Sequence, residues 1–333
     1  RLLVRREAAL ESTTRSGYSF IMKYHRPTRR FQLSLLLLLG FTYGCATTSS
    51  LIPGTPDPQL IDGVSGAQLS MKDVTPRLSS VRHIYVGEEH TSSADHGVQL
   101  QVLQSLKALN KDLVLGIEWL PLTRQPALTK WQAESLDKEA FLTAVGWKKT
   151  WGFDIDLYWP ILRWAHEHGV PVVALNAPNN LVFGYAQNGH EGLSEDDKAM
   201  LPPLDSGNPL HRAFFIEMMR KAAMAMGDKN SHAGFEDHID AYYAAQLVWD
   251  ETMAREVTKV IEEPRYKDRT VVVLAGRGHV DYGLGIPERV RASTGQPYLI
   301  VSPATEKYQP STDAKEDPSG RILPKANLYW WAQ

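Results

Sequence analysis

The 333-residue chain contains one cysteine, Cys45, so it cannot form an intrachain disulfide. It also lacks internal repeats, long low-complexity tracts and any apolar run long enough for a stable transmembrane helix. No long run of Lys or Arg residues occurs after residue 44. The formal net charge of −2 hides a local +6 in residues 1–44, so the remaining chain carries −8. A mildly acidic body of this kind gives no electrostatic basis for nucleic-acid binding, and we expect no nucleic-acid partner.

The composition is that of an ordinary globular protein, with 43% hydrophobic and 22% charged residues. The length allows one large domain with insertions or two small ones. Such a chain can bury a sizeable core without disulfides.

Residues 22–45 have the pattern of an export signal. Basic residues in 23–30 precede a short apolar run over 33–41, and Gly44 stands just before Cys45. The apolar run is shorter than the ~20 residues that a bilayer-spanning helix needs. The pattern therefore predicts a signal peptide that starts at Met22, with upstream sequence before it.

The Gly44-Cys45 pair resembles the lipobox of bacterial lipoproteins, in which cleavage leaves a fatty-acylated cysteine at the N-terminus. Thr42 stands where that motif usually has Leu, and the alternative is an ordinary signal peptide with a chance cysteine. Ala46, with no Asp at this position, resembles lipoproteins sorted to the outer membrane. We therefore expect lipidation at Cys45, a tether over 45–58 and a place in the cell envelope, at the outer membrane of a Gram-negative bacterium.

Five short β-branched runs end in polar or glycine-rich turns: 81–86, 113–117, 170–175, 270–275 and 298–301. Strands that are apolar without alternation are typical of a parallel sheet buried on both faces. Helical segments are expected over 96–109, 158–168 and 236–261, and helix-and-loop insertions over 121–156 and 177–234. The pattern predicts a three-layer α/β domain over 59–305, with a mainly parallel sheet and helical insertions at the carboxyl edge of the strands. A mostly polar tail with an aromatic end, 306–333, follows without an assigned role.

Polar side chains stand just past the ends of four of these strands: Glu88, His90, Glu118, Asn176 and His279. In open α/β sheets, ligands bind in the crevice outside the carboxyl ends of the strands, so we expect these groups to converge. The long helix adds Tyr242, Gln246 and Asp250 on one stripe, and His96 opens the first predicted helix. Each residue alone has the alternative of a helix cap or surface partner; the coincidence at equivalent positions favours a functional cleft.

Two chemistries fit this set. Glu88, His90, Glu118 and His279 are suitable ligands for a divalent metal such as Zn²⁺, Mn²⁺ or Fe²⁺, which would permit hydrolysis. Alternatively, Glu88 and His279 act as an acid/base pair without metal. The spacing does not decide between them.

The same residues belong to motifs that resemble the ChaN-like family of haem-binding lipoproteins. The motifs are G-E-x-H at 87–90, H-x-x-Q at 96–99, G-I-E at 116–118, W-G-F-D…Y-x-P-I-L at 151–162, A-L-N at 174–176, A-Q-L-V-W-D-E-T-M-A at 245–254 and L-A-G-R-G-H-V…G-I-P at 274–287. They cover nearly all of 80–290 in order. The resemblance implies haem binding in iron acquisition.

In that family the haem iron is bound by a tyrosine phenolate and the haem lies between two subunits, which implies a homodimer. Here Tyr242 or Tyr243 would be the ligand, with His96, Asn176, Gln246 and Asp250 as further cofactor contacts.

The two G-x-x-H elements and Glu118 also resemble a wider superfamily that includes erythromycin esterase and Tiki-type metalloproteases. The hypotheses are therefore a haem-binding lipoprotein, a metal-dependent hydrolase of esterase or peptidase type that uses the same cleft, and an envelope scaffold without activity.

Overall fold

The structure is a computed structural model that describes residues 58–134, 137–206, 208–225, 238–306 and 309–331. These residues belong to one compact unit, Ser50–Gln333. The predicted signal peptide, the lipidation residue Cys45 and all but the last residue of the predicted tether lie outside the described ranges.

A mainly parallel sheet of eight strands forms the centre of this unit, in the order β2-β1-β10-β7-β3-β6-β4-β5. Its strands are β1 (Gln59–Asp62), β2 (Gln68–Leu69), β3 (His83–Glu88), β4 (Leu113–Pro121), β5 (Val172–Asn176), β6 (Thr270–Gly276), β7 (Tyr298–Ala304) and β10 (Leu328–Trp331). The pairs from β10 to β5 are all parallel, and β1 pairs antiparallel with both β10 and β2. A small hairpin of β8 (Ala314–Glu316) and β9 (Ile322–Pro324) stands apart from this sheet.

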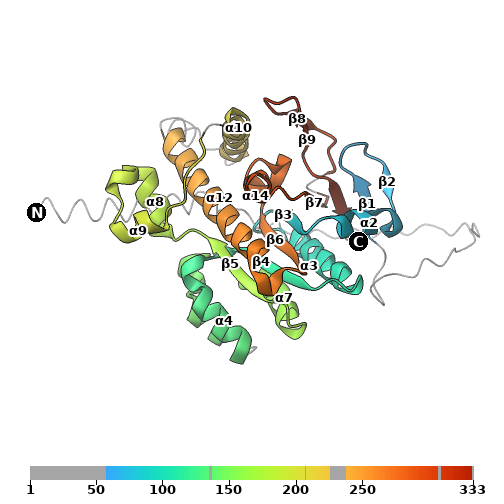
Figure 1. The fold of residues 1–333 in the computed structure, drawn as a ribbon, viewed down its shortest axis with the longest axis horizontal. Coiled ribbons are helices and arrows are strands. Elements are labelled where there is room, and N and C mark those ends of the chain that lie inside the picture. Colours follow the sequence, from blue (N-terminus) through green and yellow to red (C-terminus); the bar gives the residue numbers. More distant parts are fainter. Residues whose placement is uncertain (1–57, 135–136, 207, 226–237, 307–308, 332–333) are drawn as a thin grey trace, which may run out of the picture. The chain divides into compact units, whose positions relative to one another are not determined.

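Helices cover both faces of the sheet. The larger ones are α2 (Met71–Ser80), α3 (Ser93–Ala108), α4 (Gln125–Glu134), α5 (Lys138–Val145), α7 (Ile155–Glu167), α8 (Asn179–Asn188), α10 (Pro209–Ala225), α12 (Ile239–Glu262) and α14 (Ile286–Thr294). Shorter ones are α6 (Trp147–Thr150), α9 (Glu195–Met200) and α13 (Arg277–Val280). In Figure 1, α12 crosses one face of the sheet and α3 lies against the other, and two separate apolar clusters confirm these opposite layers.

Strand β6 shows why the sequence forms three layers. Val272 and Leu274 pack into the cluster that contains α3 and α7, whereas Val271, Val273 and Ala275 pack into the cluster that contains α12 and α14. Because successive side chains of a strand point to opposite faces, a run of five apolar residues must be covered on both sides. The predicted α/β class and the predicted parallel sheet are confirmed.

The outer edge of β5 is covered by two glutamines of α4. The Gln125 amide donates to the Val172 carbonyl and accepts from the Ala174 N–H, at 3.1 and 2.7 Å. Two helical turns further along α4, Gln132 donates to the Val170 carbonyl and accepts from the Val172 N–H, both at 3.1 Å. Since an open strand edge invites pairing with other chains, these amides take the place of a further strand and close the edge.

The sheet extends past residue 305, where the sequence analysis placed the end of the domain. Leu328 to Trp331 form β10, which pairs with β7 on one side and β1 on the other. Trp330 is completely buried, and its Nε1 donates to Gln101 of α3 at 3.1 Å. The aromatic end of the tail is therefore part of the core. No helix in the described ranges has the length and apolarity to cross a membrane.

Candidate functional site

Three neighbouring strands carry the candidate residues to one edge of the sheet. Glu88 is the last residue of β3 and lies opposite Gly276, the last residue of β6. Strand β4 pairs with the other side of β6 and carries Glu118 directly after the paired Ile117. The two buried glutamates therefore flank the end of β6. This is the convergence that parallel strand ends predict.

Glu88 is held on the α3 side of the sheet. Its Oε1 lies 2.7 Å from Nδ1 of His90, and its Oε2 lies 4.0 Å from Nε2 of His96. His96 itself is fixed by Gln99, at 3.0 Å, and by the His90 carbonyl, at 3.2 Å. The predicted H-x-x-Q element is thus a support for the turn that carries His90.

The Glu88 Oε2 atom is buried without a hydrogen-bond partner among the described residues. A buried carboxylate oxygen in that state is costly unless a cation or a donor satisfies it. Glu88, His90 and Glu118 also each offer a ligand atom within 4.8 Å of the others. Two carboxylates and one imidazole are a donor set that fits Zn²⁺, Mn²⁺ or Fe²⁺.

The backbone at Gly276 is shaped for this cluster. A Cβ atom there would lie 2.8 Å from the His90 ring and 3.6 Å from Glu118 Oε2. The Gly276 N–H donates to the same Glu118 oxygen at 2.6 Å. Only glycine lets the His90 ring lie this close to the end of β6.

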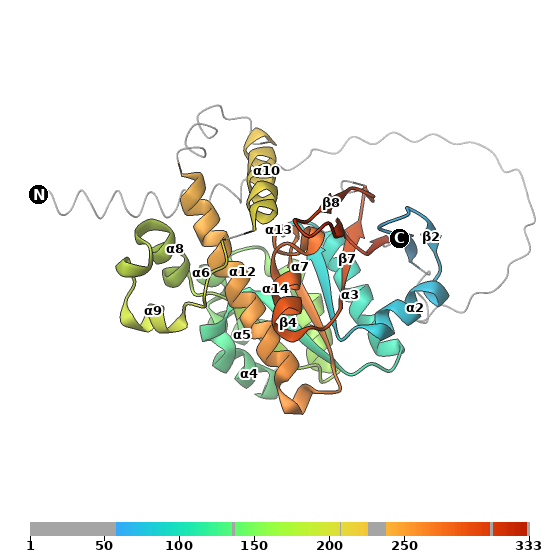
Figure 2. The same cartoon turned by 45° about the horizontal axis from the view of Figure 1, so that its top comes forward.

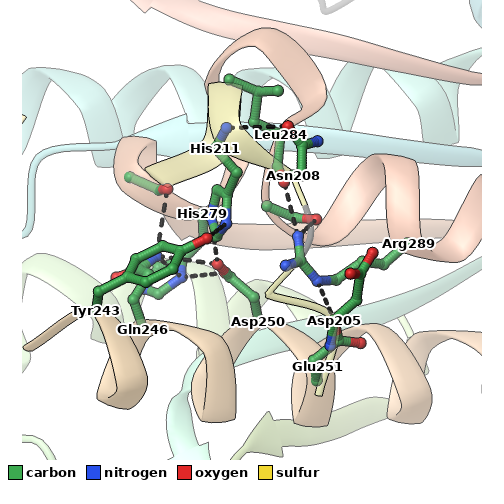
Figure 3. Close-up of polar contacts among 12 residues, drawn as sticks. Asp205, Asn208, His211, Tyr243, Gln246, Asp250, Glu251, His279, Leu284 and Arg289 are labelled. Carbon is green, nitrogen blue, oxygen red and sulfur yellow. Dashed lines mark hydrogen bonds and ion pairs between the residues drawn. The ribbon is translucent and has the colours of Figure 1, made fainter. Parts of the chain in front are cut away.

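Glu118 connects this cluster to a second group on the α12 side of the sheet. Its Oε1 lies 3.4 Å from Nε2 of His279, which belongs to α13 directly after β6. The other ring nitrogen of His279, Nδ1, lies 2.7 Å from Asp250 Oδ1 on α12, and Gln246 lies 3.0 Å from that nitrogen (Figure 3). Because Nδ1 donates to Asp250, the ring turns Nε2 toward Glu118.

The charges around the two histidines favour their protonated forms. Burial lowers the pKa of His279, but Glu118 and Asp250 outweigh it and raise that pKa to about 10. Burial likewise opposes protonation of His90, yet Glu88 and Glu118 raise its pKa to about 9. Burial raises the pKa of Asp250, while His279 and His211 bring it well below its usual range. Without a metal ion the centre is thus an alternating set of carboxylates and imidazolium groups.

An aromatic wall lines the open side of His90, whose side chain is 24% exposed. The ring centroids of Trp151 and Phe153 lie 4.8 and 5.0 Å from that of the imidazole. Tyr158 of α7 donates its hydroxyl to the His90 carbonyl at 2.8 Å. The predicted W-G-F-D…Y motif therefore supplies the aromatic packing and the hydroxyl group that hold His90 in place.

A buried ion pair joins the two turns that carry the histidines. Asp95 Oδ2 accepts from the Glu89 N–H and from Arg277 Nη2, both at 2.9 Å. Arg277 also donates to the Pro303 carbonyl at 2.9 Å and to Ser302 Oγ. Asp95 belongs to the first turn of α3, where Ser92 caps the helix. This pair fixes the position of the turn at 88–90 relative to the turn at 276–279.

A family model described as haem-binding uptake, Tiki superfamily, ChaN matches residues 74–290, which include the glutamates and histidines of the centre. The chain belongs to the ChaN haem-binding family. The predicted resemblance is confirmed.

Three proteins show the range of similarity. The ChaN protein of Campylobacter jejuni, solved with cofacially bound haem, has a TM-score of 0.62 and 15% identity over 82% of this chain and 96% of its own. The Arabidopsis thaliana protein RETICULATA-RELATED 5, chloroplastic, is 26% identical over 238 residues, which are 66% of this chain. This chain spans about a third of that relative, 30% of its length. A mutant erythromycin esterase matches with a TM-score of 0.44 and 12% identity.

The ChaN-family residues predicted from sequence lie in three places. Glu88, His90, Glu118, His279, Gln246 and Asp250 are together in the centre, with His96 behind Glu88. Asn176 ends β5, the outermost strand, where its Oδ1 accepts from the Ala177 N–H at 2.8 Å. Tyr242 is 39% exposed on α12, whereas Tyr243 is buried.

Sequence analysis of this ChaN-family chain missed His211 and the Asp95–Arg277 pair. His211 lies on α10 inside a predicted insertion, with no motif around it, and is buried beside Asp250. A signal existed for Arg277, because a charged residue within the glycine-rich turn of an otherwise apolar strand end requires a buried partner.

Proposed function

We propose that this protein binds haem and is held at a membrane surface by a lipid on Cys45, where it takes part in haem or iron acquisition. The match to the ChaN family over residues 74–290 is the observation that carries haem binding. A second copy of the chain is the proposed partner in binding.

Tyr242 fits the role of iron ligand better than Tyr243. Tyr242 is 39% exposed, so a planar cofactor can reach its phenol. Tyr243 is buried, its hydroxyl lies 3.1 Å from His211 Nδ1, and burial raises its pKa to about 12, which disfavours the phenolate that binds iron.

Two of the helices also expose large side chains that suit an apolar cofactor. Met224 of α10, 64% exposed, and Tyr242 are among the few large apolar side chains that the described residues expose. They lie toward the end of α10 and the start of α12, which extend past the sheet on the same side (Figure 2). Exposed apolar side chains on these two helices would offer haem contact area, and the Tyr242 phenol would offer the iron a ligand.

Haemin titration tests the proposal. The purified protein from residue 46 onward is expected to give a saturable Soret shift, and Tyr242→Phe is expected to weaken haem binding about tenfold or more, because the iron loses its protein ligand. Tyr243→Phe is the matched control on the next residue and should bind haem like the wild type. A Soret titration without saturation, or equal effects of the two variants, would reject this assignment.

Cys45 carries the proposed membrane attachment. Cys45→Ser is expected to move the protein from the membrane fraction to the soluble fraction of the producing cells, because it removes the acyl chains that would hold the protein at the membrane. Fractionation with Thr42→Leu as control, which keeps the cysteine, measures this. Unchanged membrane association of the serine variant would contradict lipid anchoring.

A second candidate function is metal-dependent hydrolysis at the centre. The observation that favours it is the group Glu88, His90 and Glu118, with the unpartnered Glu88 Oε2. A divalent ion held there would act as a Lewis acid and lower the pKa of a water molecule. His279 lies outside the three-ligand group, in contact with Glu118, and its protonated Nε2 is placed to give a proton to a leaving group.

Metal analysis and an ester assay test this second function. Glu118→Gln is expected to lower affinity for Zn²⁺ or Mn²⁺ by about 100-fold or more, since it removes a ligand and the contact to His279. His279→Gln should keep most of the metal but lose hydrolysis of p-nitrophenyl butyrate. Glu191→Gln, at a side chain 92% exposed, is the control. Absence of stoichiometric metal in the wild type would remove this candidate.

A further inference from the structure

His211 links an insertion helix to the centre. It lies on α10 and is 1% exposed, and its Nε2 lies 3.0 Å from Asp250 Oδ2 (Figure 3). Its other ring nitrogen, Nδ1, lies 3.1 Å from the Tyr243 hydroxyl. The two oxygens of one fully buried carboxylate are therefore shared between His211 and His279.

This sharing determines the orientation of Asp250. A carboxylate bonded through one oxygen only can rotate about its χ2 torsion, whereas contacts on both oxygens fix its plane. Gln246 Nε2 also donates to Oδ2 at 3.2 Å, so His211 and Gln246 hold this oxygen together while His279 holds Oδ1. When the Tyr243 hydroxyl donates to Nδ1, the His211 proton is on Nε2, the nitrogen that lies 3.0 Å from Asp250 Oδ2.

We propose that His211 is a positioning residue, which fixes Asp250 and thereby turns His279 toward Glu118. The continuous path is Tyr243–His211–Asp250–His279–Glu118, so that α10 completes the centre although it comes from an insertion. An effect of His211 on catalysis rests on the second candidate function, hydrolysis. The position of His279 relative to Asp250 can be measured without any reaction.

The start of α10 is held by contacts that do not involve the His211 ring. Asn208 Oδ1 accepts from the backbone N–H groups of Leu210 and His211, at 3.0 and 3.2 Å. Glu251 Oε1 accepts from the Asp205 N–H at 3.2 Å and from Arg289 Nε at 2.7 Å, as Figure 3 shows. A substitution of the His211 side chain therefore leaves these contacts in place.

The test uses the ring proton of His279 in metal-free protein labelled with ¹⁵N-histidine. Its Nδ1–H resonance, assigned by its loss in His279→Gln, is expected at low field because the bond to Asp250 is short and charged. Two replacements of similar size separate position from bulk. His211→Gln places an N–H at the position of Nε2 and should keep the resonance and slow exchange. His211→Asn does not reach Asp250 and should exchange about tenfold faster.

The outcomes separate clearly. Equal exchange rates in His211→Gln and His211→Asn, both folded by near-UV circular dichroism, would overturn the positioning role. His190→Gln, an exposed histidine of the same insertion, must leave the resonance unchanged. If the wild type hydrolyses esters, kcat is expected to fall in His211→Asn with KM nearly constant and to recover in His211→Gln. A wild type without hydrolysis would end the second candidate function, while the exchange rates would still decide the positioning role.

Discussion

Replacing Asp250 by alanine is expected to lower the free energy of unfolding by about 3–5 kcal/mol. Asp250 has no exposed surface and contacts His279 Nδ1 at 2.7 Å and His211 Nε2 at 3.0 Å. Its removal leaves the His279 imidazole, which is protonated at pH 7, buried without its carboxylate and leaves a cavity beside it. The loss is large because the partners stay behind, and not because the ion pair itself contributes that much.

Urea denaturation at pH 7 measures this change, with the slope of the transition checked against that of the wild type. Asp240→Ala is the matched control. Asp240 is on the same helix, its side chain is 86% exposed, and it pairs with Arg212, whose side chain is 43% exposed. Its effect should stay within about 0.5 kcal/mol. A loss below ~1 kcal/mol for Asp250→Ala would mean that the two histidines are neutral or reach water.

Much of the fold was predictable because burial on both faces leaves a direct trace in the sequence. The five apolar residues of β6 fit only a strand covered twice, and the polar residues that follow it mark the strand end. The tail was not predictable in this way. Strand β10 is four residues long and follows a polar segment, so its place beside β7 depends on a surface that only the folded sheet provides.

The residues of the site also divide into those whose position the sequence pattern predicted and those whose position it did not. Glu88 ends β3, Glu118 follows the last residue of β4 that pairs with β6, and His279 lies in α13 directly after β6. Gln246 and Asp250 are one helical turn apart. Strand and helix periodicity therefore predicted that these residues lie together. Asn176 has an equivalent strand-end position but belongs to the outermost strand, and its side chain caps its own turn instead. Periodicity gives the face of an element and not the distance across the sheet.

His211 shows what local pattern omits. It becomes a neighbour of Asp250 because α10 packs against α12, and that contact joins a residue of a predicted insertion to a residue of the long helix 39 positions later. The same holds for Asp95 and Arg277, 182 residues apart. Partners of a buried charge are required by energetics, but their identity follows from tertiary packing alone.

Raising the pH from 7 to 9 is expected to cost the metal-free protein ~3 kcal/mol of its free energy of unfolding. Glu118 and Asp250 raise the pKa of His279 to about 10, against the opposing effect of burial, and Glu88 and Glu118 raise that of His90 to about 9, from an ordinary value of 6.5. Groups whose pKa is raised on folding bind more protons in the native state. Their stabilisation is complete below pH 6.5 and is lost as the pH rises through 9 and 10, with a slope that approaches ~1.4 kcal/mol per pH unit for each histidine.

Both histidines interact with Glu118, so their contributions to the pH dependence of stability are less than additive. Variants of these residues identify which groups cause this pH dependence. The free energy of unfolding is measured by urea denaturation at pH 6.5, 7.5, 8.5 and 9.5. Its decrease with pH is expected to become smaller in the double variant His90→Gln/His279→Gln and to remain as in the wild type in His190→Gln. Glu118→Gln should reduce the slope as well, since it lowers both pKa values. A wild-type stability that is constant over this range would show that neither imidazole is protonated in the fold, and the alternating charges of the centre would then require another proton arrangement.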